Sequence, residues 1–126
     1  MSESESLATL LGRLQVAGGV DLAAVVSIDG FLIEATHAEG LDAEEFAAVA
    51  TNGLMVAKAI GREVERGEIE SAIFEYETGT VIINALDDEL VLILLASSGV
   101  NLGRLRLIAR RYREELIAAA ATIAGD

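Results

Sequence analysis

Residues 68–96 read EIESAIFEYETGTVIINALDDELVLILLA, and this stretch decides the fold. It holds three runs rich in apolar and β-branched residues: Glu68 to Tyr76, Thr80 to Leu86 and Glu89 to Ala96. Only Glu77-Thr78-Gly79 and Asp87-Asp88 separate these runs. Because links this short join neighbouring strands only as hairpins, the stretch predicts an antiparallel meander of three strands.

Toward the N-terminus the sequence predicts one helix and one further hairpin. The helix is expected to begin near Ser2, which forms a Ser-x-x-Glu capping box with Glu5, and to end at Gly18-Gly19. Its apolar residues have the spacing of an amphipathic helix: Leu7, Leu10, Leu11 and Leu14. Two strands follow, Leu22 to Ile28 and Phe31 to Thr36, and Asp29-Gly30 is expected to form a two-residue turn between them.

Two longer helices complete the chain. The first is expected to begin at Asp42 and to run to about Arg66, where Gly67 stops it. One broad apolar face of this helix is expected to cover the sheet: Phe46, Val49, Ala50, Gly53, Leu54, Ala57, Ile60 and Val64. Asn101 caps the last helix, whose apolar stripe is Leu102, Leu105, Ala109, Tyr112, Leu116, Ala119 and Ile123.

The resulting order of elements is α-β-β-α-β-β-β-α. The first, fourth and fifth strands are apolar on both alternations, so helices must cover both faces of the sheet. Helices one and three can cover one face and helix two the other. The sequence therefore predicts one α/β domain of the α+β type over residues 1–126, a three-layer sandwich with a five-stranded antiparallel sheet.

The third strand differs from its neighbours because charged residues interrupt its apolar pattern. This pattern is typical of a sheet edge, which must be blunted or paired. Two alternatives stay open: the charges blunt the edge, or the strand pairs with the same strand of a second copy. The residues expected at such a dimer edge are Ile69, Ser71, Ile73 and Glu75.

The second helix carries an unusual stripe opposite its expected core face. The stripe consists of small residues and a methionine where a solvent-exposed face normally carries Lys and Glu. It predicts a protein-interaction face made of Ala48, Asn52, Met55, Ala59 and Arg62. The alternative is that alanine is present only as a good helix former.

Composition excludes several classes of function. The formal net charge is −12, which disfavours binding to nucleic acids and to anionic membranes. No apolar run approaches the roughly 20 residues of a membrane span, and the acidic start does not resemble a secretory signal. Cysteine is absent, so disulfides are excluded, and the cytoplasm is the expected location.

Signals for chemistry are weak. The one histidine, His37, has no nucleophile partner, and Asp87-Asp88-Glu89 has the composition of a turn as well as of a cation site. The five arginines between Arg104 and Arg113 are expected to lie on a solvated helix face. No catalytic, cofactor-binding or metal-binding residue is predicted, and neither a cofactor nor a small-molecule substrate is expected.

The element order and several local strings resemble the roadblock family of dynein light-chain and GTPase-regulatory proteins. The matching stretches are Gly19 to Gly30, the alanine-rich second helix, the strand pair Thr80 to Leu95, and Asn101 to Arg106 leading to Arg110-Arg111. Together they cover the chain from about Leu7 to Ala121. The resemblance implies a roadblock/profilin-like fold and a homodimer, in which third strands join two sheets and second helices lie side by side.

In prokaryotic members of that family the partner is typically a Ras-like GTPase, contacted by the shared helix layer. The resemblance therefore implies a non-catalytic regulator that alters the GTPase's nucleotide hydrolysis or localisation without supplying an arginine finger. A second hypothesis is a light-chain-like scaffold subunit with no effect on GTP turnover. A third is a small-molecule sensor or enzyme, which would need an apolar pocket with convergent polar groups.

Overall fold

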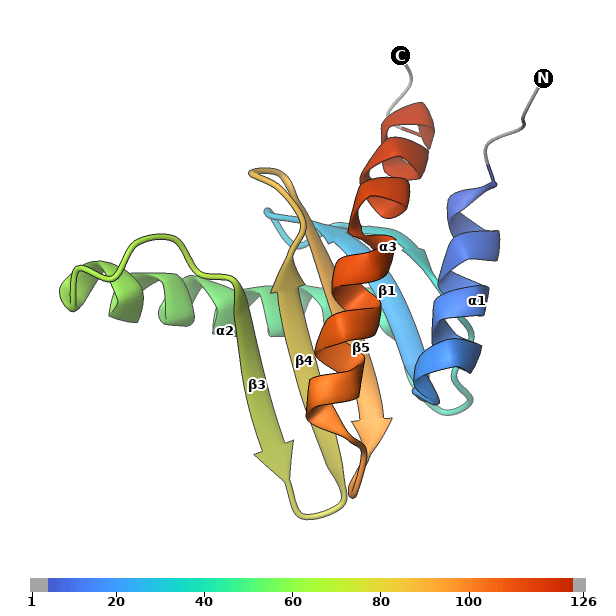
Figure 1. The fold of residues 1–126 in the computed structure, drawn as a ribbon, viewed down its shortest axis with the longest axis horizontal. Coiled ribbons are helices and arrows are strands. Elements are labelled where there is room, and N and C mark those ends of the chain that lie inside the picture. The colour runs from blue at the N-terminus through green and yellow to red at the C-terminus, as the bar shows by residue number, and fades with distance from the viewer. Residues whose placement is uncertain (1–4, 124–126) are drawn as a thin grey trace.

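The computed structural model describes residues 5–123, which form three helices and five strands (Figure 1). The chain order is α-β-β-α-β-β-β-α, as the sequence predicts. The elements are α1 (Leu7–Gly18), β1 (Leu22–Ser27), β2 (Leu32–Ala35), α2 (Ala43–Glu63), β3 (Ser71–Tyr76), β4 (Gly79–Ala85), β5 (Leu90–Ser97) and α3 (Leu102–Ile123).

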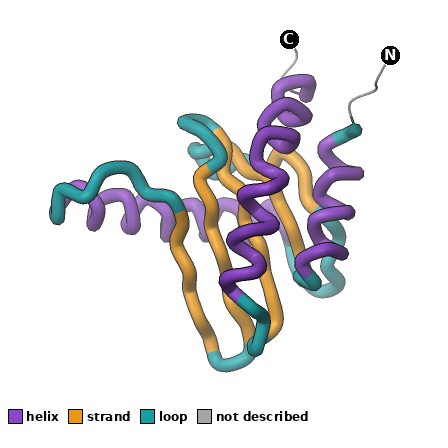
Figure 2. The backbone as a smooth tube through the Cα atoms, viewed as in Figure 1, coloured by secondary structure: helices purple, strands orange, loops and turns teal. Residues whose placement is uncertain are grey.

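The five strands form one antiparallel sheet in the order β2-β1-β5-β4-β3. Helices α1 and α3 pack together on one face, and α2 lies on the other (Figures 1 and 2). The buried side chains accordingly form two clusters, one on each face of β1, β4 and β5. The predicted three-layer α+β sandwich is confirmed.

The hairpin between β1 and β2 has a longer loop than the two-residue turn that Asp29-Gly30 predicts. Ser27 pairs with Phe31 through a backbone hydrogen bond of 2.8 Å, which leaves three residues in the loop. Gly30 adopts a φ of +95°, a conformation that a residue with a Cβ adopts only with strain. The register also shifts between Val25 and Val26, so the extra residue is accommodated by an irregularity in β1–β2 pairing.

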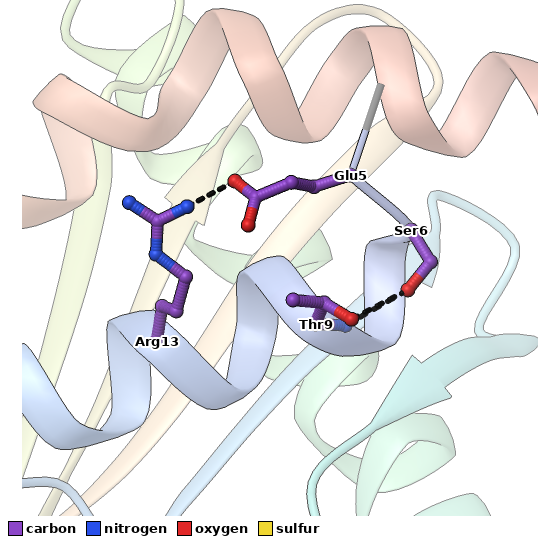
Figure 3. Close-up of polar contacts among 4 residues, drawn as sticks. All are labelled: Glu5, Ser6, Thr9 and Arg13. Carbon is purple, nitrogen blue, oxygen red and sulfur yellow. Dashed lines mark hydrogen bonds and ion pairs between the residues drawn. The ribbon is translucent and has the colours of Figure 1, made fainter. Parts of the chain in front are cut away.

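Helix α1 begins later than the capping box of Ser2 and Glu5 predicts. Its N-cap is Ser6, whose Oγ accepts a hydrogen bond from the Thr9 backbone N–H at 3.1 Å. The Ser6 hydroxyl also donates to the Thr9 hydroxyl oxygen at 2.9 Å (Figure 3). Ser2 lies outside the described residues, and Glu5 pairs instead with Arg13 on the next turns of α1. The hydrogen bond to the Glu5 carboxylate raises the pKa of the Arg13 guanidinium above its usual value.

Replacing Ser6 by alanine is expected to lower the free energy of unfolding by about 1 kcal/mol, because the first turn of α1 loses its capping acceptor. Urea denaturation followed by circular dichroism measures this loss. Ser6→Asp keeps an acceptor at the same position and is expected to stay within a few tenths of a kcal/mol of wild type. Equal stability of Ser6→Ala and wild type would contradict the assignment of this cap.

The remaining boundaries agree closely with the sequence, with two exceptions. Helix α2 ends at Glu63, with Val64 as its C-cap, and not near Arg66 before Gly67. The other exception is the start of β3. Asn101 caps α3 through its Oδ1, which accepts from the Arg104 N–H at 2.9 Å. Strand β3 begins at Ser71 rather than at Glu68. Ile69 therefore belongs to the preceding loop, where it is half-buried against the cluster under α2. Within residues 5–123, no helix is both long and apolar enough to cross a bilayer.

Candidate functional site: the outer face of α2 and the edge at β3

Helix α2 is attached to the sheet by a narrow line of side chains. Asp42 caps its start by accepting from the Glu44 and Glu45 N–H groups. The residues of α2 that are fully buried are Ala47, Thr51 and Leu54. The Thr51 hydroxyl donates to the Ala47 carbonyl at 2.7 Å, so this small polar residue can lie against the sheet with its donor satisfied.

The apolar face expected to cover the sheet is therefore only partly correct. Leu54 is buried, and Phe46, Ala50, Gly53 and Ala57 are half-buried. Three large apolar members of that face are instead 52–64% exposed: Val49, Ile60 and Val64, the last in the C-cap position. Val56, which the sequence did not assign to this face, is 61% exposed as well. We call these four residues the apolar row.

The last three members of the apolar row are exposed where α2 is longer than the sheet is wide beneath it. In Figure 1 the C-terminal half of α2 extends past β3, the last strand on that side. No residue of α2 after Leu54 is fully buried. Val56, Ile60 and Val64 thus belong to a helical segment that projects beyond the molecule's own sheet.

A small apolar groove lies between α2 and β3, next to this overhang. It has a volume of about 250 Å³ and is lined mainly by Phe46, Val49, Gly53, Phe74 and Tyr76. Gly53 allows close packing here, because a Cβ at this position would lie 3.2 Å from the Phe74 ring. Tyr76 is 63% exposed, so an apolar surface continues from α2 to the edge strand.

The residues predicted as an interaction face all lie on the outside of α2. Ala48, Asn52, Met55, Ala59 and Arg62 are exposed, and Met55 has half of its side chain accessible. They border the apolar row along the helix, and the two sets together form what we call the outer face of α2. The sequence predicted the small-residue half of this face to be outside, whereas it assigned Val49, Ile60 and Val64 of the other half to the core.

Strand β3 is an open edge, as the sequence indicates. The Ala85 N–H donates to the Glu70 carbonyl, and the β3–β4 register pairs Ala72 with Ile83 and Ile73 with Ile82. Since hydrogen-bonded positions alternate along an antiparallel ladder, Ser71, Ile73 and Glu75 direct their backbone groups away from β4. Ile73 and Glu75 are exposed, and Ser71 is half-buried.

A second groove lies between α3 and the start of β3, and it reaches around the edge of the sheet to Lys58 of α2. Its volume is about 570 Å³, and three arginines at helical spacing on α3 line it, Arg106, Arg110 and Arg113. Ser71 and Asn84, which are paired across β3 and β4, also line it. We call it the α3–β3 groove. All five arginines from Arg104 to Arg113 are exposed, as expected.

The residues that the sequence singled out for chemistry lie in exposed loops and turns. No group of three or more His, Cys, Asp or Glu side chains within residues 5–123 is placed to hold a metal ion. His37 is exposed in the loop after β2. The Oδ1 atom of Asp87 accepts from the N–H groups of Glu89 and Leu90, so this carboxylate organises the β4–β5 turn.

Comparison with known sequences matches residues 7–96 to the Roadblock/LC7 domain. Two uncharacterised proteins of Methanocaldococcus jannaschii, MJ1340 and MJ0310, are 30% and 29% identical to this chain. Each alignment extends over 108 residues and covers 85% of this chain and 93% of the relative.

Solved structures share the fold. Myxococcus xanthus MglB superposes with a TM-score of 0.84 at 17% identity, covering 98% of this chain and 95% of MglB. A Roadblock/LC7 domain from Streptomyces avermitilis superposes with a TM-score of 0.66 at 27% identity, covering 88% and 98%. Acanthamoeba castellanii profilin IA has a TM-score of 0.62 at 16% identity, covering 90% and 98%. With its family match over most of its length, this chain belongs to the Roadblock/LC7 family.

Proposed function

We propose that this protein is a homodimeric, non-catalytic regulator that acts in the cytoplasm and binds a small Ras-like GTPase. The two copies join at their β3 edges, and the outer faces of both α2 helices form the binding surface. Binding alters the GTPase's nucleotide hydrolysis or its localisation.

The observation that carries this proposal is the projecting half of α2. Val56, Ile60 and Val64 are more than half exposed on a helix that has passed the edge of its own sheet. Fully burying a side chain of this size contributes about 1.5–3 kcal/mol, so a helix in this position favours a second surface. A copy joined at β3 would bring its own sheet and its own α2 to this place.

Two further features support the same arrangement. The outward backbone groups of Ser71, Ile73 and Glu75 can continue the ladder into a second copy. MglB has also been solved with a tetrameric arrangement, and that structure superposes on this chain with a TM-score of 0.82. Association of copies is therefore compatible with this fold.

The GTPase assignment rests on the family resemblance together with the chemistry of the surface. An arginine finger must reach the γ-phosphate, which is usually achieved from an exposed loop. Most arginines here lie within α2 or α3, with Arg62 in the last turn of α2. We therefore propose that the protein acts by positioning the GTPase and not by inserting a catalytic group.

The proposed contact predicts that Met55→Arg and Ala59→Glu each weaken GTPase binding at least tenfold, because each places a charge on the outer face of α2. The measurement is titration of this protein against the Ras-like GTPase encoded nearest to it, loaded with GDP or with a non-hydrolysable GTP analogue. Arg111→Glu, exposed on α3, is the matched control and should bind as wild type does. Light scattering on each variant measures whether the dimer is retained, independently of GTPase binding.

Single-turnover phosphate release distinguishes regulation from a scaffold role. A rate above the GTPase's intrinsic rate supports the regulator. Nucleotide-independent binding with an unchanged rate supports a scaffold instead. Wild-type affinity of both α2 variants would exclude the outer face as the binding site.

A further inference from the structure

The α3–β3 groove contains donors of hydrogen bonds that nothing in the described chain accepts. Among residues 5–123, the ion pairs of the groove's arginines are limited to Arg113 with the exposed Glu114, at 3.4 Å. Four acids, Glu68, Glu70, Asp87 and Asp88, line the groove together with Lys58, yet none lies within 4 Å of an arginine nitrogen. Arg106 and Arg110 are thus available to a further carboxylate.

Asn84 identifies where such a carboxylate would lie. Its Nδ2 atom is buried and has no hydrogen-bond partner within residues 5–123. A buried donor without a partner costs about 1–3 kcal/mol, so an acceptor here is strongly favoured. Asn84 lies opposite Ser71 on the edge strand, and the small serine side chain leaves room for a group that approaches across the edge.

The geometry of edge pairing limits which residue of a second copy can approach. A two-fold axis perpendicular to the joined sheet keeps α3 of both copies on the same side. Residues directly opposite each other in an antiparallel pair point to the same face, so odd-numbered positions must pair with odd-numbered ones. Every such register is centred on one residue, which lies opposite the same residue of the second copy. Within the middle of β3 the choices are Ala72, Ile73 and Phe74.

Two of these registers place a charged side chain opposite an apolar one within two residues of the axis. Centring on Ala72 sets Phe74 against Glu70, and centring on Phe74 sets Ile73 against Glu75. Neither gives Glu75 a favourable neighbour.

Centring on Ile73 sets apolar residues opposite apolar residues on both faces. Ile73 then faces its own copy on the α3 side, and Ala72 faces Phe74 on the α2 side. Glu75 lies opposite Ser71, at the mouth of the α3–β3 groove. In this register the first charged residue opposite an aromatic or apolar one is Glu70 against Tyr76, three residues from the axis.

We propose that β3 pairs with itself in this register, and that Glu75 of the second copy completes the α3–β3 groove. Its carboxylate passes over Ser71, accepts a hydrogen bond from Asn84 Nδ2 and forms an ion pair with Arg110. By symmetry, each dimer contains two such sites. This inference rests on the proposed dimer, but it assigns the register and a residue that acts in trans.

The first test is disulfide cross-linking, which is simple because the chain contains no cysteine. In the proposed register Ile73→Cys places its thiol opposite its own copy, at the roughly 5.5 Å Cα separation that a disulfide tolerates. Under mild oxidation it should form a covalent dimer. Ser71→Cys and Glu75→Cys should each fail alone, because four residues of offset separate identical positions by about 14 Å. Mixed together, these two variants should cross-link.

The second test is a charge swap, measured as the dissociation constant of the dimer by sedimentation. Arg110→Glu and Glu75→Arg should each raise this dissociation constant on the order of tenfold. In the double variant the dissociation constant should return to within about threefold of the wild-type value. Since each chain carries a net charge of −12, general repulsion alone would make Glu75→Arg tighten the dimer. Arg111→Glu and Glu39→Arg control for the change in net charge.

The outcomes separate the register from the dimer itself. A wild-type dimer that cross-links through Ala72→Cys or Phe74→Cys instead of Ile73→Cys overturns the register and leaves the proposed function standing. A double variant weaker than both single variants overturns the ion pair. A monomeric wild-type chain overturns both this inference and the proposed function.

Discussion

Replacing Ile73 by proline is expected to convert the dimer into a folded monomer. The backbone N–H of Ile73 points away from β4, so proline removes a donor from the open edge without breaking the β3–β4 ladder. The proline ring also prevents close approach of a neighbouring strand. Because the two-fold axis repeats the change in both copies, we expect the dissociation constant to rise about a hundredfold, equivalent to about 2.7 kcal/mol.

Light scattering over a dilution series measures this change, and circular dichroism establishes that the monomer stays folded. Ile73→Val is the matched control, since it keeps both the backbone donor and a β-branched side chain. It should associate within about threefold of wild type. If Ile73→Pro were as dimeric as wild type, the copies would have to meet somewhere other than β3.

The layers of this fold could be predicted because its strands carry unambiguous patterns. Val91 to Leu95 is apolar on both alternations, so β5 had to lie in the middle of the sheet with helices on both sides. The charges around Ile73 likewise indicate an edge strand from the sequence alone. Short links such as Asp87-Asp88 then determine which strands are neighbours.

The burial of α2 could not be predicted in the same way, because the helix is apolar around more than half of its circumference. Val49, Ile60 and Val64 are larger and more hydrophobic than Ala47 and Thr51, two of the three residues buried against the sheet. The periodicity of α2 reports which positions share a face but not where the sheet ends beneath them. The overhang past β3 depends on the width of the sheet and on the crossing direction of α2, which are tertiary properties.

The α3–β3 groove could not be predicted from the sequence for a related reason. The spacing of Arg106, Arg110 and Arg113 predicts a solvated stripe, which is correct as far as exposure is concerned. Nothing local to Asn84 indicates that its amide would be buried without a partner. The relation between these residues appears only when β3 and β4 pair and α3 crosses above them.

Replacing Leu54 by alanine is expected to loosen α2 more than any other single change within that helix. Leu54 has no exposed surface and is the one large side chain among the buried residues of α2. It packs in a cluster with Ile83, Val91 and Ile93. Leucine-to-alanine changes in a core cost about 2–5 kcal/mol, and we expect about 3 kcal/mol here.

Urea unfolding at protein concentrations below the dimer dissociation constant measures this loss without a contribution from association. Hydrogen exchange should show the amides of α2 losing protection before those of β1 and β5, because Ala47 and Thr51 alone hold the helix weakly. Met55→Ala, one position along but half exposed, is the matched control and should change stability by no more than about 0.5 kcal/mol.

A Leu54→Ala protein should also bind a GTPase and a second copy less tightly, although Leu54 touches neither in the proposed complexes. The outer face of α2 can present the apolar row only while the inner face is held against the sheet. Undiminished protection of α2 amides in Leu54→Ala would mean that half-buried contacts such as Phe46 and Phe74 suffice to hold the helix. The interaction surface would then be more rigid than the buried residues of α2 indicate.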